Sequence, residues 1–414
     1  MTTNAPAQQH IRDCMARIAE HEPRVRAFAQ YDEPRLNAWL EQKDTSTGAP
    51  LDGLALGVKD IIDALPFPTS SGTGLRAGTI PARDAAAVAQ LRKAGAVVMG
   101  KTVTTEFAFF SPGPTRNPHD PARTPGGSSS GSAAAVAAGF IDAGLGSQTA
   151  ASITRPASYC GVVGFKPSYG SYSLAGVGGL APSFDTLGVI CRDVATVAAV
   201  HAVLAGPAPA APVAESRVPT RIGLCRTPWW HQAQPATQQA MAQAQTVLSA
   251  ETVVEEVDLS AFDEAARLHS EIMAFEAGQT LADELATHPE GLSPVLNAML
   301  IAGMRIDRAH HRDNLRKSAA LRARIADLFG AYDILLAPAA PGEAPVGLAA
   351  TGDPIFSRIW SLLHLPTITL PGFTGPAGMP VGLQLLAGLN EDETLLAHAH
   401  WVEQRLPKAP RPPL

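Results

Sequence analysis

Apolar residues along the first hundred positions alternate between helical and strand-like spacing. One side of a helix over residues 8–28 carries four of them, namely Ile11, Met15, Ile18 and Val25. Residues 53–63 (GLALGVKDIID) have the apolar run of a buried strand that leads into a loop. Asp84 is placed to cap a helix that Gly95 ends, and residues 96–99 follow as a strand. This succession of elements predicts an α/β fold.

The same alternation continues beyond a Pro/Ala-rich stretch at residues 206–218 (GPAPAAPVAESRV). Strands are expected at 221–225, 251–258, 332–338, 366–370 and 380–387, and helices over 236–250, most of 261–330, and 391–405. Because strands occur on both sides of the stretch and can join one sheet, it is a weak domain boundary.

Composition narrows the class of protein. Of the 414 residues, 46% are hydrophobic and 17% charged, which excludes global disorder. A net charge of −6 without Lys/Arg clusters argues against nucleic acid or an anionic membrane as partner. No apolar run reaches the roughly 20 residues of a membrane span, and the N-terminus lacks the apolar region of a secretory signal. We therefore expect a cytoplasmic protein.

No metal site is expected from the cysteines or histidines. The four cysteines contain no CxxC pair, so reduced, buried thiols are favoured: Cys14, Cys160, Cys191 and Cys225. The pairs His398/His400 and His310/His311 do not share one face of a helix.

The candidate chemistry lies in serine-rich segments of the first half. A Pro-rich stretch at 111–126 leads into GGSSSGS at 126–132 and a small-residue helix at 133–139, and a second polar stretch, GSQTAAS, covers 146–152. GSSSG matches the nucleophile elbow of α/β-hydrolases in form, but the strand that must precede an elbow is missing.

A neutral lysine is the other group that takes a proton from serine. Lys59 lies among apolar neighbours, and burial there would lower its pKa. The alternative is a lysine neutralised by Asp60 or Asp63, although Asp60 should point to the opposite face of a strand. The residues alone leave both readings open.

Four segments together resemble the amidase signature family: GVKDIID at 57–63, PGGSSSGSAAAVAAG at 125–139, GSQTAASITRPASYCGVVGFKPSYG at 146–170 and SFDTLGVICRDV at 183–194. The resemblance extends over residues 5–405. It implies a Ser–Ser–Lys triad in which Ser152 is the nucleophile, Ser128 bridges after a cis peptide bond, and Lys59 is the base. Ser129 and Ser130 would support the hydrogen-bond network or cap the following helix.

The resemblance also implies an oxyanion hole formed by the backbone N–H groups of Thr149, Ala150, Ala151 and Ser152. The chain departs from the family here, because Ala150-Ala151 replaces Gly-Gly and alanine tolerates positive φ poorly. Gln148 stands where many members have Asp, and its amide would make the same structural hydrogen bonds.

The implied fold is a large mixed, mostly parallel central β-sheet covered by helices on both faces. It forms a single domain, residues 1–414, with an N-terminal helical region (1–50), a catalytic core (51–205), the linker-like stretch (206–220) and a C-terminal part that completes the sheet (221–414).

The substrate pocket is less defined by the sequence. Arg155, with the segment at 350–366, resembles the malonamidase-type members, in which this arginine binds a substrate carboxylate. The alternative is a structural ion pair. Segments 226–231 and 269–276 are candidates for the pocket wall, and Trp229 and Trp230 are expected to pack.

The expected function is hydrolysis of a small amide through an acyl-enzyme, with a substrate such as malonamate. Hydrolysis of a carbamate, ester or urea-like amide by the same triad remains open, and so does a catalytically inactive scaffold. The amidase subunit of a tRNA-dependent amidotransferase is less favoured, because the C-terminal half is short and no basic surface is evident. No cofactor and no metal are expected, and a homodimer is left open.

Overall fold

The computed structural model describes residues 6–41, 48–206 and 216–414. Within them an eleven-stranded sheet has the order β1-β3-β2-β4-β6-β5-β10-β11-β9-β7-β8. The strands are β1 (Phe28–Tyr31), β2 (Ala55–Lys59), β3 (Val97–Thr102), β4 (Ala143–Gln148), β5 (Val163–Lys166), β6 (Thr186–Cys191), β7 (Arg221–Leu224), β8 (Val253–Glu256), β9 (Ile334–Pro338), β10 (Thr367–Thr374) and β11 (Pro380–Leu386). Strands from both sides of the Pro/Ala-rich stretch therefore join one sheet, although most of the stretch itself lies outside the described residues.

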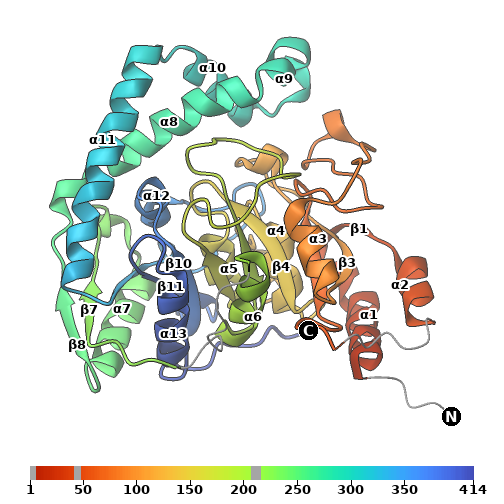
Figure 1. Cartoon of the computed structure of the whole chain (residues 1–414), viewed down its shortest axis with the longest axis horizontal. Helices are drawn as coiled ribbons and strands as arrows, with labels where there is room; N and C mark the ends of the chain where they lie inside the picture. Colours follow the sequence, from red (N-terminus) through yellow and green to blue (C-terminus); the bar gives the residue numbers. More distant parts are fainter. Residues whose placement is uncertain (1–5, 42–47, 207–215) are drawn as a thin grey trace.

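Helices cover both faces of this sheet (Figure 1). They are α1 (Pro6–Val25), α2 (Glu33–Leu40), α3 (Ala86–Lys93), α4 (Ser130–Ala137), α5 (Thr154–Cys160), α6 (Val194–Leu204), α7 (Pro235–Leu248), α8 (Ala265–Thr280), α9 (Ala282–Thr287), α10 (Pro294–Met304), α11 (Arg308–Ala326), α12 (Ile355–Leu362) and α13 (Asp392–Glu403). In Figure 1, α8, α10 and α11 form a layer along one edge of the molecule.

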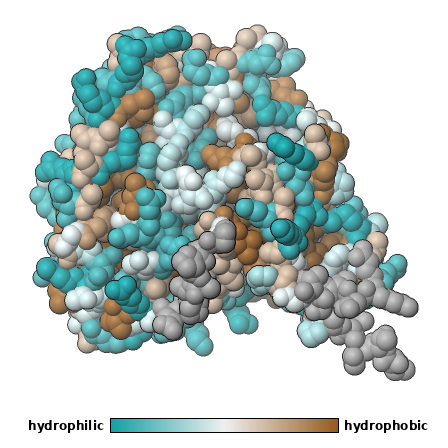
Figure 2. All heavy atoms as spheres, viewed as in Figure 1, coloured by the Kyte–Doolittle hydropathy of each residue, from teal (hydrophilic) through white to brown (hydrophobic). Residues whose placement is uncertain are grey.

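The two faces of the sheet supply two parts of the core because neighbouring strand residues point in opposite directions. Val189 of β6 packs in the cluster with α3, α6, α7 and α13, whereas the next residue, Ile190, packs with α1, α4 and α5. Large apolar side chains are thus mostly inside. The face shown in Figure 2 is largely hydrophilic, with apolar side chains in small separate areas.

The mixed character of the sheet is confirmed, but the expected parallel majority is wrong. Six of the ten neighbouring strand pairs are antiparallel. One of them pairs β1 with β3 at one edge, and the other five run without interruption through the middle of the sheet, from β4 to β9. There β10 and β11 are joined by residues 375–379 alone, and such a short connection can link only antiparallel strands.

Two local expectations also differ from the structure. Asp84 does not cap α3; its carboxylate accepts from the Leu65 N–H at 2.7 Å and pairs with Arg92 at 3.1 Å. The N-terminal region is not wholly helical, because β1 adds an edge strand beside β3. Gly95 does follow the end of α3, with φ of +100°.

Candidate active site

Lys59 is the last residue of β2, and its amino group is fully buried. The Nζ atom donates to Ser128 Oγ at 2.7 Å and to Ser147 Oγ at 2.8 Å. Burial lowers the pKa of Lys59 to about 7, opposed in part by the negative charge of Asp185. Asp60 points to the other side and pairs with Lys101 at 3.1 Å, so the expectation that it would not neutralise Lys59 is confirmed.

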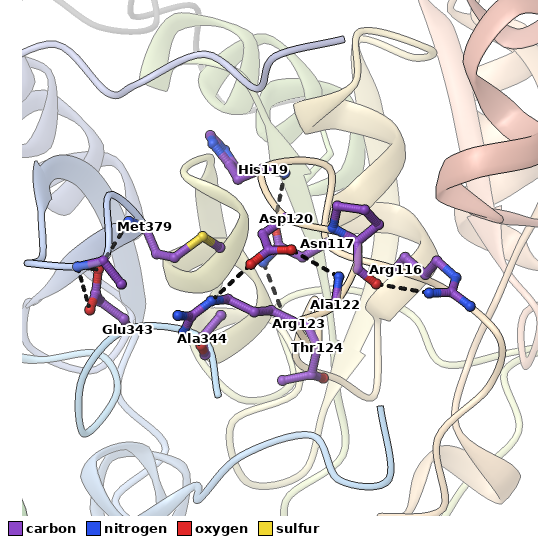
Figure 3. A network of polar contacts seen from close by, with 12 residues as sticks. Arg116, Asn117, His119, Asp120, Ala122, Arg123, Thr124, Glu343, Ala344 and Met379 are labelled. Carbon is purple, nitrogen blue, oxygen red and sulfur yellow. Dashed lines mark hydrogen bonds and ion pairs between the residues drawn. The ribbon is translucent and has the colours of Figure 1, made fainter. Parts of the chain in front are cut away.

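The Pro-rich segment before Ser128 is held in place by side chains, since it has little regular structure (Figure 3). Asn117 Nδ2 donates to the carbonyl oxygens of Thr124 (3.2 Å) and Tyr159 (2.9 Å), which ties the segment to α5. Figure 3 shows Arg123 between Asp120 and the carbonyl oxygen of Ala344. These contacts fix the path of the chain toward the serines.

The segment ends at two glycines. Gly126 has φ of +81°, and a Cβ atom there would lie 2.8 Å from the Pro156 backbone, so glycine is required. The peptide bond between Gly127 and Ser128 is cis, as the resemblance implies. Ser128 and Ser152 both line one pocket of about 310 Å³. Ser152 is 8% exposed, and its hydroxyl makes no hydrogen bond within the described part of the chain.

Residues 149–152 connect β4 to α5, and all four of their carbonyl oxygens accept hydrogen bonds. The donors are His269 Nε2 for Thr149, Ser361 Oγ for Ala150, Arg155 N for Ala151 and Ser129 N for Ser152. Their four N–H groups, by contrast, have no acceptor among the described residues. Because the carbonyls are held elsewhere, the N–H groups are available to an oxyanion.

The alanines that replace glycines fit this loop. Neither Ala150 nor Ala151 has positive φ, so the loop does not use the backbone region that alanine tolerates poorly. Gln148 fixes its end: Oε1 accepts from the N–H groups of Ile153 (2.9 Å) and Thr154 (3.1 Å), and Nε2 donates to Ser361 Oγ. The amide therefore makes structural hydrogen bonds at the start of α5.

Ser129 and Ser130 lie behind the pocket. Ser129 Oγ donates to the Ser147 carbonyl oxygen at 3.4 Å, and Ser130 Oγ donates to that of Val103 at 3.3 Å. Ser129 occupies the N-cap position of α4 without a side-chain capping bond. Both serines thus anchor the start of α4 to neighbouring strands.

Arg155 lines the pocket and is 3% exposed. Its guanidinium donates to the carbonyl oxygens of Gly127 (2.7 Å) and Gly352 (2.6 Å) and to Thr351 Oγ1. No carboxylate forms an ion pair with it in residues 6–41, 48–206 and 216–414, and its Nε has no partner. The expected alternative, a structural ion pair, is therefore not found there. Burial lowers the pKa of Arg155 to about 10, so the group stays cationic near neutral pH.

The rest of the pocket is apolar, and the sequence located little of it. Of the two segments considered for the wall, 269–276 contributes Met273, while 226–231 does not reach the pocket. Trp229 and Trp230 pack against core clusters instead. The remaining lining residues are Ala108, Phe109, Phe110, Leu180 and Pro354. Ala108 ends a short 3-10 helix (Glu106–Ala108), and the others come from irregular segments without a recognisable pattern.

Comparison with known proteins places this site in a family. The Amidase family profile matches residues 9–396. The chain belongs to the Amidase family. It is 32% identical to the A-subunit of glutamyl-tRNA(Gln) amidotransferase from Synechococcus sp. (strain RCC307), over 97% of this chain and 94% of that protein. A crystal structure of an amidase is 32% identical with a TM-score of 0.88, covering 97% and 96% of the two chains. Peptide amidase from Stenotrophomonas maltophilia is 28% identical with a TM-score of 0.81, covering 98% and 95%.

These likenesses confirm the family and an amide-hydrolysing enzyme, and they correct the finer resemblance. The curated relatives include several of these amidotransferase A-subunits, at 30–34% identity, and none of them singles out the malonamidase-type members. The amidotransferase function, which the sequence disfavoured, is therefore a real candidate. In the part of the chain that the structure describes, no helix of this amidase-family enzyme is long and apolar enough to cross a membrane.

Proposed function

We propose that this chain hydrolyses a small amide through an acyl-enzyme on Ser152. The observation that supports this most is the short contact between Lys59 Nζ and Ser128 Oγ, made by a lysine whose pKa lies at about 7. An ordinary lysine is cationic at neutral pH and cannot accept a proton. Lys59 is neutral in a large fraction of molecules at that pH and can act as a base.

The proposed proton relay starts from the contact between Lys59 and Ser128, and Ser152 lies in the same pocket as Ser128. Neutral Lys59 takes the Ser128 proton, and Ser128 takes the Ser152 proton as Ser152 Oγ attacks the carbonyl carbon. The N–H groups of residues 149–152 stabilise the oxyanion, each contributing about 3 kcal/mol. The relay then returns a proton to the leaving nitrogen, the C–N bond breaks, and water hydrolyses the acyl-Ser152 ester by the same route.

The substrate that fits best carries a free carboxylate, as in malonamate. Arg155 is a buried cation at the pocket wall; no carboxylate of the described residues forms an ion pair with it, although the charge of Asp353 also acts on it. A guanidinium binds a carboxylate with two parallel hydrogen bonds, and a dry site strengthens that attraction. The pocket walls are largely apolar, which suits the carbon chain of a small acyl group. Carbamates, esters and urea-like amides are reactive with the same triad and remain alternatives.

A second function is supported by the relatives. The A-subunits of glutamyl-tRNA(Gln) amidotransferases match almost the whole chain. Under this alternative the chain would act with partner subunits and release ammonia from glutamine within a complex. A homodimer of the free enzyme is the alternative assembly.

Assay of the purified chain alone separates the two functions. We expect it to release ammonia from short monoamides of dicarboxylic acids without any added protein. Ammonia is quantified over a panel that includes malonamate, glutamine, a neutral amide, a carbamate and an ester. Activity on glutamine only after partner subunits are added would favour the amidotransferase function. No activity under either condition would favour an inactive scaffold.

Replacement of Arg155 tests the carboxylate preference. We expect Arg155→Ala to lower kcat/KM for a monoamide acid relative to a neutral amide of equal length by more than about tenfold, because truncating one partner of a desolvated charge pair costs roughly 2–5 kcal/mol. Arg155→Lys should recover only part, since lysine cannot bind bidentately. The ratio is the useful quantity, because Arg155 also binds the Gly127 carbonyl oxygen and its loss should slow both substrates.

Arg322→Ala is the matched control for this experiment. Arg322 is a partly buried arginine that donates to the Leu362 carbonyl oxygen and does not line the pocket. Arg322→Ala should leave the ratio of kcat/KM for the monoamide acid to kcat/KM for the neutral amide unchanged. Equal losses on the acid and the neutral amide in Arg155→Ala would show that Arg155 is structural.

A further inference from the structure

Asp185 is a buried residue beside the candidate site, and its carboxylate takes no part in the proposed relay. It precedes β6 and is 8% exposed. Oδ1 accepts from Thr149 Oγ1 at 2.6 Å, and Oδ2 accepts from the N–H groups of Leu180 (2.7 Å) and Ala181 (3.0 Å). It forms no ion pair with any cation in the described residues. Three neutral donors thus hold the buried carboxylate group in one orientation.

The sheet register places this charge near Lys59. In the antiparallel pair β4–β6, Gln148 lies opposite Thr186 and Ser147 opposite Leu187. Asp185 therefore lies just beyond the last paired position, next to Thr149. Lys59 Nζ is bound to Ser147 on the same ladder. The amine and the carboxylate are thus held two positions apart along one strand pair, at Ser147 and at Thr149.

The charge of Asp185 acts on the proton equilibrium of Lys59. The charge of Asp185 raises the pKa of Lys59 against the larger lowering by burial. Burial raises the pKa of Asp185 to about 6, and its three hydrogen bonds oppose that rise. At neutral pH Asp185 is mainly ionised and favours the protonated form of Lys59. It therefore keeps the pKa of Lys59 from falling further.

Other ionisable groups around Asp185 do not replace it. Glu276 of α8 raises the pKa of Asp185 and accepts from Ser183. The pKa of Tyr169 is raised, mainly by burial and also by Glu276 and Asp185, so Tyr169 is neutral. His269 binds the Thr149 carbonyl oxygen, and burial lowers its pKa to about 3, so it is uncharged near neutral pH. Among the described residues, Asp185 is the one charge that acts on Lys59 directly.

We propose that Asp185 is a positioning residue that fixes the oxyanion loop through Thr149 and sets the proton affinity of Lys59 through its charge. This role rests on the proposed amide hydrolysis at the same site. The two effects act on different parts of the reaction, since the hydrogen bond orients the N–H groups and the charge determines the pH range in which the base is neutral.

Two substitutions separate these effects. Asp185→Asn removes the charge but keeps the hydrogen bonds, because its oxygen can accept from Leu180 and Ala181 while its amide donates to Thr149 Oγ1. Thr149→Val removes one hydrogen bond to Asp185; because that bond lowers the pKa of Asp185, the carboxylate ionises at higher pH in this variant, but it still ionises. We expect Asp185→Asn to lower the pKa of Lys59 by roughly half a unit or more, and Thr149→Val to lower it by less, because its carboxylate still ionises. Both variants should reduce the plateau value of kcat/KM by about tenfold. In Asp185→Asn the cause is a weaker base, and in Thr149→Val it is a less well-ordered oxyanion loop.

The pKa of Lys59 is measured directly by NMR of ε-¹³C-lysine-labelled protein. The chain has seven lysines, and the Lys59→Met variant assigns the signal. Lys166 is an internal control, because it is also buried with a pKa of about 7 but its charged neighbour is Asp392. Its signal should titrate identically in wild type and Asp185→Asn. The acidic limb of the kcat/KM profile should move further to lower pH in Asp185→Asn than in Thr149→Val.

The titration needs no substrate, so it tests this role even if no amide is hydrolysed. An unchanged Lys59 titration in Asp185→Asn, or an equal shift in Thr149→Val, would overturn the proposal. If Asp185→Asn does not fold, the wild-type Lys59 signal still decides, because ionisation of Asp185 should add a second inflection near pH 6. A single-step titration would then reject the coupling.

Discussion

Substitution of Ser152 with alanine is expected to abolish amide hydrolysis while leaving the protein folded. Ser152 lines the pocket and belongs to the loop whose N–H groups have no acceptor among the described residues, so its hydroxyl is the proposed nucleophile. Without it no acyl-enzyme forms, and the remaining groups should support less than about a thousandth of the wild-type rate. Initial rates of ammonia release, measured at saturating substrate, test this directly.

The fold should survive because the Ser152 hydroxyl makes no hydrogen bond in the described part of the chain. The free energy of unfolding should change by less than about 1 kcal/mol. Ser158→Ala is the opposite control. Ser158 lies on α5 outside the pocket and accepts from the Gly382 N–H at 2.9 Å, so its loss should reduce stability but not the rate. A rate within tenfold of wild type in Ser152→Ala would reject the nucleophile.

The site was predictable because its residues occur in long local motifs. Lys59, Ser128 and Ser152 lie in three separate segments, and the structure brings all three together. The apolar neighbours of Lys59 indicated burial and strand geometry favoured Asp60 on the opposite face, although the residues alone left a lysine neutralised by Asp60 or Asp63 open. Local sequence carries this information because each feature depends on a few adjacent residues.

What the sequence missed depends on contacts between distant segments. Asp185 and His269 hold Thr149 from positions 36 and 120 residues away, and neither has a local pattern that shows its partner. The pocket wall is formed by irregular segments for the same reason. The antiparallel centre of the sheet follows from short connections such as residues 375–379. The length of such a connection can be read from the sequence, but which strands pair cannot.

Removal of either other member of the relay is expected to have the second-largest effect. Lys59→Met and Ser128→Ala should each lower kcat by about a thousandfold, and the double variant should be no more than about tenfold worse than either. The reason is that Ser128 passes the proton only to Lys59, so loss of one makes the other useless. Methionine is preferred to alanine because it fills the buried space. Ser132→Ala, a buried serine of α4 bound to Thr102, is the control and should retain activity.

Burial of Lys59 should also lower the free energy of unfolding of the chain. This gives a measurement that does not depend on activity. The pKa of Lys59 is about 7 in the folded chain and about 10.4 when unfolded. Between these values the unfolded state binds more protons, so the free energy of unfolding rises with pH, and the penalty is complete below about pH 7. Its full size is roughly 4–5 kcal/mol at 1.36 kcal/mol per pKa unit. Urea unfolding should therefore find Lys59→Met more stable than wild type at pH 6, with a smaller difference at pH 9.

Combining the kinetic and stability results distinguishes a catalytic lysine from a packing residue. A base held neutral by burial predicts a variant that is more stable at pH 6 and about a thousandfold slower. A lysine that only fills space predicts a variant with nearly unchanged stability and rate, because methionine has a similar shape. A variant that loses stability at pH 6 would mean that Lys59 is charged and well paired in the folded chain. The relay through Ser128 would then have no base.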